Sequence, residues 1–220
     1  MERPVETGFV FRKMEFEGAT RRYAVWVPPD YTPAKRWPVI LFLHGKGECG
    51  DDGERQTTVG LGKALREHPE RFPALVVMPQ IPVGRRWQGP ALELALAALE
   101  ATMNEYAADP DRVVGTGLSL GGYGTWALGA RCPERFAALV PICGGGDPAD
   151  AARLARVPIW CFHGDADKAV PVERSRQMVE AVRAAGGSVR YSELAGVGHN
   201  SWDAAYGDAE VIAWMLAQKR

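Results

Sequence analysis

The stretch Arg112-Val113-Val114-Gly115-Thr116-Gly117-Leu118-Ser119-Leu120-Gly121-Gly122 decides how this chain folds. An apolar run, typical of a buried strand, leads into Gly-x-Ser-x-Gly, and residues 122–128 predict the start of a helix. Gly117 and Gly121 leave room for a sharp strand-to-helix turn with Ser119 at its tip. We therefore expect the Ser119 hydroxyl to stand clear of a sheet, at the positive end of a helix, as a candidate nucleophile.

Length and composition predict one large α/β domain over residues 1–220 rather than two small ones. Hydrophobic residues make up 46% of the chain, charged residues 24%, and the formal net charge is −1. No basic face is indicated, so we expect no nucleic-acid partner. No stretch reaches the roughly 18 apolar residues of a membrane span. Nothing in the sequence indicates an oligomeric state.

The first residues lack the basic segment and apolar run of a secretory signal. We therefore expect a cytoplasmic protein, or one exported with a signal that this sequence does not include. The cysteines, Cys49, Cys132, Cys143 and Cys161, form no Cys-x-x-Cys pair and no zinc-ligand spacing with a histidine. This predicts free thiols and no metal site, with a single disulfide as the alternative.

The strand pattern predicts a sheet of about eight strands. Two early stretches, 9–16 and 22–27, mix apolar and polar residues, as an antiparallel pair at a sheet edge does. The next strands are nearly all apolar, which suits parallel strands covered on both faces, and they span 38–43, 74–78, 112–116, 137–142 and 158–162. Residues 188–194 predict a last strand.

Helical periodicity lies between these strands, at 91–107, 174–185 and 208–218. Strand and helix alternate along the chain, which predicts an α/β fold with a mostly parallel sheet and helices on both faces. The segment 146–157, between two predicted strands, is too short to hold a lid domain. We therefore expect an open, shallow site.

Four histidines could supply the base that a serine nucleophile requires. His199 lies in a glycine-rich loop after the last predicted strand, which is a favourable place for a base. His44 and His163 each follow an apolar strand and precede a glycine, a pattern that more often ties down a loop through hydrogen bonds. His68 lies in a polar, proline-flanked segment and is expected at a solvated helix end.

An acid is needed to hold the base in its working tautomer. Asp165 and Asp167 are the candidates, and because they stand two residues apart, only one of them can aim at His199. The chain order Ser, Asp, His is that of α/β-hydrolases. Donors to the transition-state oxyanion are expected from the backbone N–H groups of Leu120, which follows the serine, and Lys46, in the glycine-rich loop 44–47.

These segments together resemble lidless α/β-hydrolases. The resemblance is to the bacterial esterase and predicted-peptidase group related to the phospholipase/carboxylesterase, dienelactone hydrolase and feruloyl-esterase families, and it is carried by residues 43–48, 117–126, 163–167 and 198–202. The family pattern His-Gly-x-x-Asp implies that Asp167 is the acid. Many relatives have a basic residue where this chain has Cys49, a departure that alters one wall of the site.

The resemblance implies a serine carboxylesterase that forms an acyl-enzyme on Ser119 and needs no cofactor. The expected substrates are short-chain or aryl esters, free or borne on a polymer. Trp87 and Trp202 are candidate walls of the acyl or aryl pocket, with core packing as the competing interpretation. A serine peptidase or thioesterase, an acyltransferase and a non-catalytic binding module are the alternatives.

Overall fold

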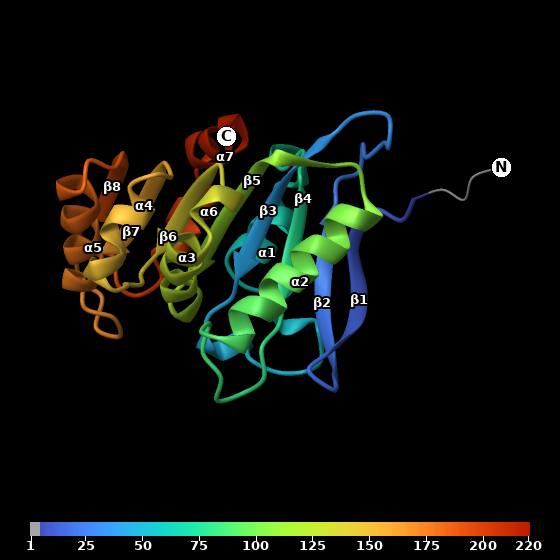
Figure 1. The fold of residues 1–220 in the computed structure, drawn as a ribbon, viewed down its shortest axis with the longest axis horizontal. Coiled ribbons are helices and arrows are strands. Elements are labelled where there is room, and N and C mark those ends of the chain that lie inside the picture. Colours follow the sequence, from blue (N-terminus) through green and yellow to red (C-terminus); the bar gives the residue numbers. More distant parts are fainter. Residues whose placement is uncertain (1–4) are drawn as a thin grey trace.

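The computed structural model describes residues 5–220 as a central sheet with helices on both faces (Figure 1). The apolar runs form inner strands that are buried on both faces, whereas the first and last strands of the sheet are partly exposed. The eight strands are β1 (Gly8–Phe16), β2 (Ala19–Val27), β3 (Trp37–Leu43), β4 (Leu75–Pro79), β5 (Ala108–Leu118), β6 (Ala138–Ile142), β7 (Ile159–Gly164) and β8 (Val189–Leu194).

The strands are arranged in the order β1-β2-β4-β3-β5-β6-β7-β8. β1 pairs with β2, and β2 with β4, in antiparallel fashion, while β3 to β8 run parallel. The predicted mostly parallel sheet with an antiparallel N-terminal edge is thus confirmed. The carboxyl ends of the parallel strands meet at one edge, so the loops that follow β3, β5, β7 and β8 gather there.

Two layers of helices bury opposite faces of the sheet. The helices are α1 (Leu61–Glu67), α2 (Pro90–Glu105), α3 (Leu120–Arg131), α4 (Ala151–Leu154), α5 (Glu173–Ala184), α6 (Trp202–Gly207) and α7 (Ala209–Ala217). Because side chains alternate along a strand, Val39 and Leu41 pack with α2 to α5, whereas Ile40 and Phe42 pack with α1, α6 and α7.

The structure differs from the predicted elements where local signals are weak. β5 begins at Ala108, before the predicted start of this strand at residue 112. The sequence did not indicate the earlier start, because the first residues of β5 are mostly polar and include Pro110. α6 occupies part of the segment taken as the loop of His199, since a helix of six residues shows no clear periodicity. Residues 143–158 hold only a 3-10 turn and the one-turn helix α4, so the expected absence of a lid domain is confirmed for this segment.

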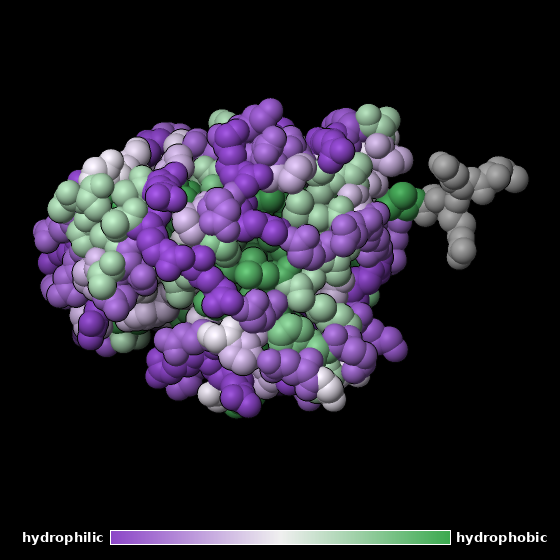
Figure 2. Space-filling model, in the orientation of Figure 1, coloured by the Kyte–Doolittle hydropathy of each residue, from purple (hydrophilic) through white to green (hydrophobic). Residues whose placement is uncertain are grey.

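The surface over helices α2, α3 and α5 is mostly hydrophilic, with small hydrophobic patches between the polar side chains (Figure 2). Within residues 5–220, no helix combines the length and the apolar character needed to cross a bilayer. The four cysteines are free thiols; Cys49, Cys143 and Cys161 are buried, and Cys132 is half-buried.

Candidate active site

Ser119 lies at the tip of the turn between β5 and α3. Its backbone adopts φ 53° and ψ −115°, a conformation that non-glycine residues rarely take. The turn is held by the Ser119 N–H, which donates to the Ile142 carbonyl at 2.9 Å. A side chain on Gly121 would collide with the Leu43 carbonyl, which explains the glycine there. Local backbone geometry therefore presents the Ser119 hydroxyl above the sheet.

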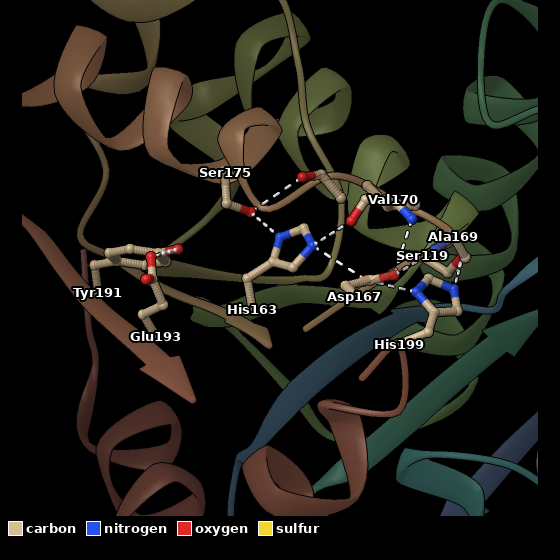
Figure 3. Close-up of polar contacts among 10 residues, drawn as sticks. Ser119, His163, Asp167, Ala169, Val170, Ser175, Tyr191, Glu193 and His199 are labelled. Atoms are coloured by element: carbon tan, nitrogen blue, oxygen red, sulfur yellow. Dashed lines mark hydrogen bonds and ion pairs between the residues drawn. The ribbon is translucent and has the colours of Figure 1, made fainter. Parts of the chain in front are cut away.

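His199 reaches this hydroxyl from the loop between β8 and α6. Its Nε2 lies 2.9 Å from Ser119 Oγ, and its Nδ1 lies 2.7 Å from Asp167 Oδ2 (Figure 3). The ring packs edge-to-face on Trp202, with the centroids 5.3 Å apart. Three loops distant in sequence thus bring a hydroxyl, an imidazole and a carboxylate into one hydrogen-bonded row.

The Asp167 carboxylate is fully buried in the loop after β7, with 0% of its side chain exposed. Burial opposes its ionisation, but the hydrogen bonds from His199 and from the backbone N–H groups of Val170 and Ala169 outweigh it and hold its pKa below the ordinary value. The group is therefore a carboxylate at neutral pH, suited to accept from an imidazole. Asp165, the other candidate acid, accepts from the Gly196 N–H instead.

His44 supports the loop after β3 from inside the core. Its Nε2 accepts from the Ile81 N–H at 3.2 Å, and its Nδ1 donates to the Gly45 carbonyl at 2.6 Å. Burial lowers the pKa of His44 to about 4, although the bond to the Gly45 carbonyl works in the opposite direction. The ring is therefore neutral, as expected for a residue that ties down a loop.

Trp87 is buried, and it is not among the residues that line the cavity over Ser119, although it borders the neighbouring cavity beside Leu120 and Tyr123. Its side chain is 1% exposed, its Nε1 donates to the His44 carbonyl at 2.9 Å, and its ring packs edge-to-face on His44. The Trp87 side chain thus packs against the buried loop of His44 and is not exposed to solvent. Trp202 is half-buried beside His199 and is not among the residues that line the cavity over Ser119.

A cavity of about 520 Å³ opens over Ser119. Lys46, in the 3-10 turn after β3, and Leu120, the first residue of α3, both line it, as does Cys49. The remaining lining comes from residues that the sequence analysis did not assign to the site, namely Gly84, Arg85, Arg86, Tyr123, Ala169 and Val170. The sequence feature that could have indicated this part of the cavity wall is the adjacent pair Arg85 and Arg86, in a loop after a buried strand.

Cys143 Sγ, Asp167 and His199 bring ligand atoms within 4.8 Å of one another, an arrangement that can hold a metal ion. In this structure Asp167 and His199 are hydrogen-bonded to each other and His199 to Ser119. Burial raises the pKa of the Cys143 thiol to about 12, which disfavours the thiolate that a metal requires. The arrangement therefore fits the hydrogen bonds that link Ser119, His199 and Asp167 better than it fits a metal site.

This fold and the strand–Ser119–helix turn define an α/β-hydrolase. Residues 83–206 match the model of the dienelactone hydrolase family, and this segment includes Ser119, Asp167 and His199. Because the match covers more than half of the sequence, the chain belongs to the dienelactone hydrolase family. None of the curated proteins compared with the sequence matches it.

Solved structures share the fold. A thermostable esterase is similar with a TM-score of 0.87 and 34% identity over 96% of this chain, and this chain spans 63% of the length of that esterase. A ferulic acid esterase has a TM-score of 0.76 and 17% identity, covering 96% of this chain and 100% of its own. An acylaminoacyl peptidase of Pyrococcus horikoshii has a TM-score of 0.72 and 15% identity, covering 97% and 42%.

Proposed function

We propose that this protein is a serine carboxylesterase in which Ser119, His199 and Asp167 are nucleophile, base and acid. The observation that carries the proposal is the row of hydrogen bonds from Ser119 Oγ to His199 Nε2, at 2.9 Å, and from His199 Nδ1 to Asp167 Oδ2, at 2.7 Å. A hydroxyl becomes a useful nucleophile only when a base takes its proton, and the base works only when its second nitrogen is held.

In the proposed reaction, Ser119 Oγ attacks the ester carbonyl while His199 Nε2 accepts the hydroxyl proton. The bond to the alcohol then breaks, His199 returns the proton to the leaving oxygen, and an acyl-enzyme forms. Water, deprotonated by His199, attacks the acyl carbonyl. The bond between the acyl carbon and Ser119 Oγ then breaks, His199 returns the proton to Ser119 Oγ, and the carboxylic acid is released. Side chains and backbone of this chain handle every proton and charge in the scheme.

The oxyanion that forms at each step is assigned to the backbone N–H groups of Lys46 and Leu120. Leu120 is the first residue of α3, so its N–H has no acceptor within the helix and lies at the positive end of the helix dipole. Both residues line the cavity over Ser119. The side chain of Lys46 need not take part.

The substrates proposed are short-chain or aryl carboxylic esters, free or borne on a polymer, handled by one domain over residues 1–220. The segment 143–158 forms no lid, which favours small or protruding esters over long lipids. The esterase neighbours support this choice, and the peptidase neighbour keeps serine peptidase or thioesterase as the second candidate.

The test has two parts. A fluorophosphonate probe should label Ser119 in the native protein and nothing in Ser119→Ala, whose far-UV spectrum should match that of the native protein. The relative rates on acetate, butyrate, octanoate and ferulate esters, an acyl thioester and an aminoacyl anilide then rank the substrate classes. Ser119→Ala should lose on the order of a million-fold in kcat. Near-native turnover in that variant would refute the mechanism.

A further inference from the structure

His163 lies directly behind the proposed catalytic acid. The His163 and Asp167 side chains are both 0% exposed, and His163 Nε2 is 3.2 Å from Asp167 Oδ2. His199 Nδ1 approaches the same oxygen from the other side at 2.7 Å. Figure 3 shows His163 between Ser175 and Asp167, with His199 beyond the carboxylate. Two imidazoles therefore meet on one carboxylate oxygen.

The surroundings of His163 determine where its proton lies. Nε2 faces two oxygen acceptors, the Val170 carbonyl at 3.0 Å and Asp167 Oδ2 at 3.2 Å. A bare nitrogen would be repelled by both, so Nε2 carries a proton. Nε2 donates this proton to the Val170 carbonyl and lies at ion-pair distance from Asp167 Oδ2. On the opposite side, Nδ1 lies 2.7 Å from the hydroxyl oxygen of Ser175, on α5, and the Ser175 hydroxyl donates to the Gly144 carbonyl at 3.0 Å. Ser175 therefore holds the ring with Nε2 directed toward Asp167.

The Asp167 carboxylate is fully supplied with donors. Oδ1 accepts from the N–H groups of Ala169, at 2.8 Å, and Val170, at 2.9 Å, while Oδ2 faces His199 and His163. An ionised carboxylate has about four lone-pair sites; three of them accept hydrogen bonds here, and His163 Nε2 faces the carboxylate at 3.2 Å as the fourth partner. Removal of the His163 donor would leave an unsatisfied site on a group that no water reaches.

We propose that His163 is a positioning residue for the esterase reaction: by directing its Nε2–H toward Asp167 Oδ2, it orients the carboxylate toward His199 and shares its charge. This inference rests on the proposed function, since His163 acts through Asp167. With the donor present, two imidazoles divide the charge on Oδ2. Without the His163 donor, the full negative charge of Asp167 Oδ2 acts on His199 and favours the protonated His199 ring, which cannot accept the Ser119 proton.

The other charged groups near His163 have partners of their own. Glu193 is its register partner on β8, but the Glu193 carboxylate accepts from Arg176 and from Tyr191 Oη. Figure 3 shows Tyr191 and Glu193 joined to each other, away from the His163 ring. Asp167 is therefore the charge that His163 serves.

The test compares His163→Leu, which removes the donor, with His163→Gln, whose side-chain N–H can take the place of Nε2–H. Steady-state kcat and KM on a nitrophenyl acetate are measured across pH. The Leu variant should lose roughly 10- to 100-fold in kcat with KM nearly unchanged, because the N–H partner of a charged group is lost. Its acid limb of kcat/KM should move to higher pH, and the Gln variant should restore both. His68→Gln, at the C-terminal end of α1, is the control and should change neither.

Near-native activity in the Leu variant would overturn the proposal, as would equal losses in the Leu and Gln variants with an unmoved acid limb, since that pattern marks packing alone. If the Leu variant does not fold, Ser175→Ala provides the second test. Ser175→Ala should move the acid limb of kcat/KM to higher pH, by less than His163→Leu is expected to. An acid limb at the same pH as in the native protein would overturn the proposal.

Failure of the proposed function would look different, because the native protein itself would not hydrolyse esters. In that case the far-downfield proton resonance of the His199–Asp167 hydrogen bond is followed by NMR. It should move further downfield in His163→Leu, or in Ser175→Ala, and return in His163→Gln. A resonance that is the same in all of these proteins would refute the role of His163.

Discussion

Asp165 accepts a hydrogen bond from the backbone N–H of Gly196 at 2.7 Å, and so ties the loop after β7 to the loop that carries His199. Asp167, two residues further, places Oδ2 2.7 Å from His199 Nδ1. The two carboxylates thus hold one loop in different ways. Asp165 anchors its backbone, and Asp167 holds its imidazole.

This division predicts unequal effects of Asp167→Asn and Asp165→Asn. Asp167→Asn should lower kcat by about 10⁴-fold, because an amide in that place favours the wrong tautomer of His199. Asp165→Asn should cost little, because the amide oxygen can still accept from the Gly196 N–H. Initial rates on a nitrophenyl ester measure both. The reverse ranking would move the acid from Asp167 to Asp165.

A backbone donor at Lys46 can be separated from its side chain. Lys46→Ala should keep nearly full activity, whereas Lys46→Pro removes the N–H and should raise the barrier by about 3–4 kcal/mol. Proline fits here, since Lys46 begins a 3-10 turn and Gly45 is extended, with φ −78° and ψ −177°. Both variants should melt like the native protein. Equal kcat in the two would exclude this N–H as an oxyanion donor.

Buried His44 predicts a loss of stability in acid. Its pKa falls from 6.5 to about 4 on folding, so the unfolded chain binds the extra proton below pH 6.5. The stability is fully present above pH 6.5 and is lost as the pH falls toward 4, by on the order of 3 kcal/mol, since each pKa unit is worth about 1.4 kcal/mol. Urea unfolding at several pH values measures it.

The matched variant for this measurement is His44→Gln, which does not titrate. It should be less stable than the native protein at neutral pH, because the bond from Ile81 is disturbed, but its stability should fall less steeply between pH 6.5 and 4. Parallel slopes in the two proteins would show that His44 does not set the acid sensitivity.

The lidless segment 143–158 predicts no interfacial activation. With no domain that must swing away from Ser119, the rate on tributyrin should rise smoothly with substrate through the concentration at which droplets form. A lipase with a known lid is the positive control in the same emulsion series. A sharp increase in rate at the emulsion point would mean that some part of the chain covers the site.

The parts of this protein that the sequence predicted are those with local causes. The turn at Ser119 follows from a buried strand, two glycines and a helix start within about a dozen residues. The parallel strands follow from continuous apolar runs, because a strand with one face in solvent would alternate apolar and polar residues. Strand and helix ends were displaced by a few residues, and α6 was missed, because short polar segments have no periodicity to detect.

Tertiary structure decided which side chains meet. Asp165 and Asp167 are equivalent by spacing, and only the approach of the loop after β8 gives one the imidazole and the other a backbone N–H. Trp87 became a core residue because it packs on His44 in the loop after β3, and Ser175, on α5, holds the His163 ring beside Asp167. The backbone conformation of a turn depends on the few residues that form it. Contacts between loops depend instead on the relative positions of strands that are distant in sequence, which no short segment of the chain encodes.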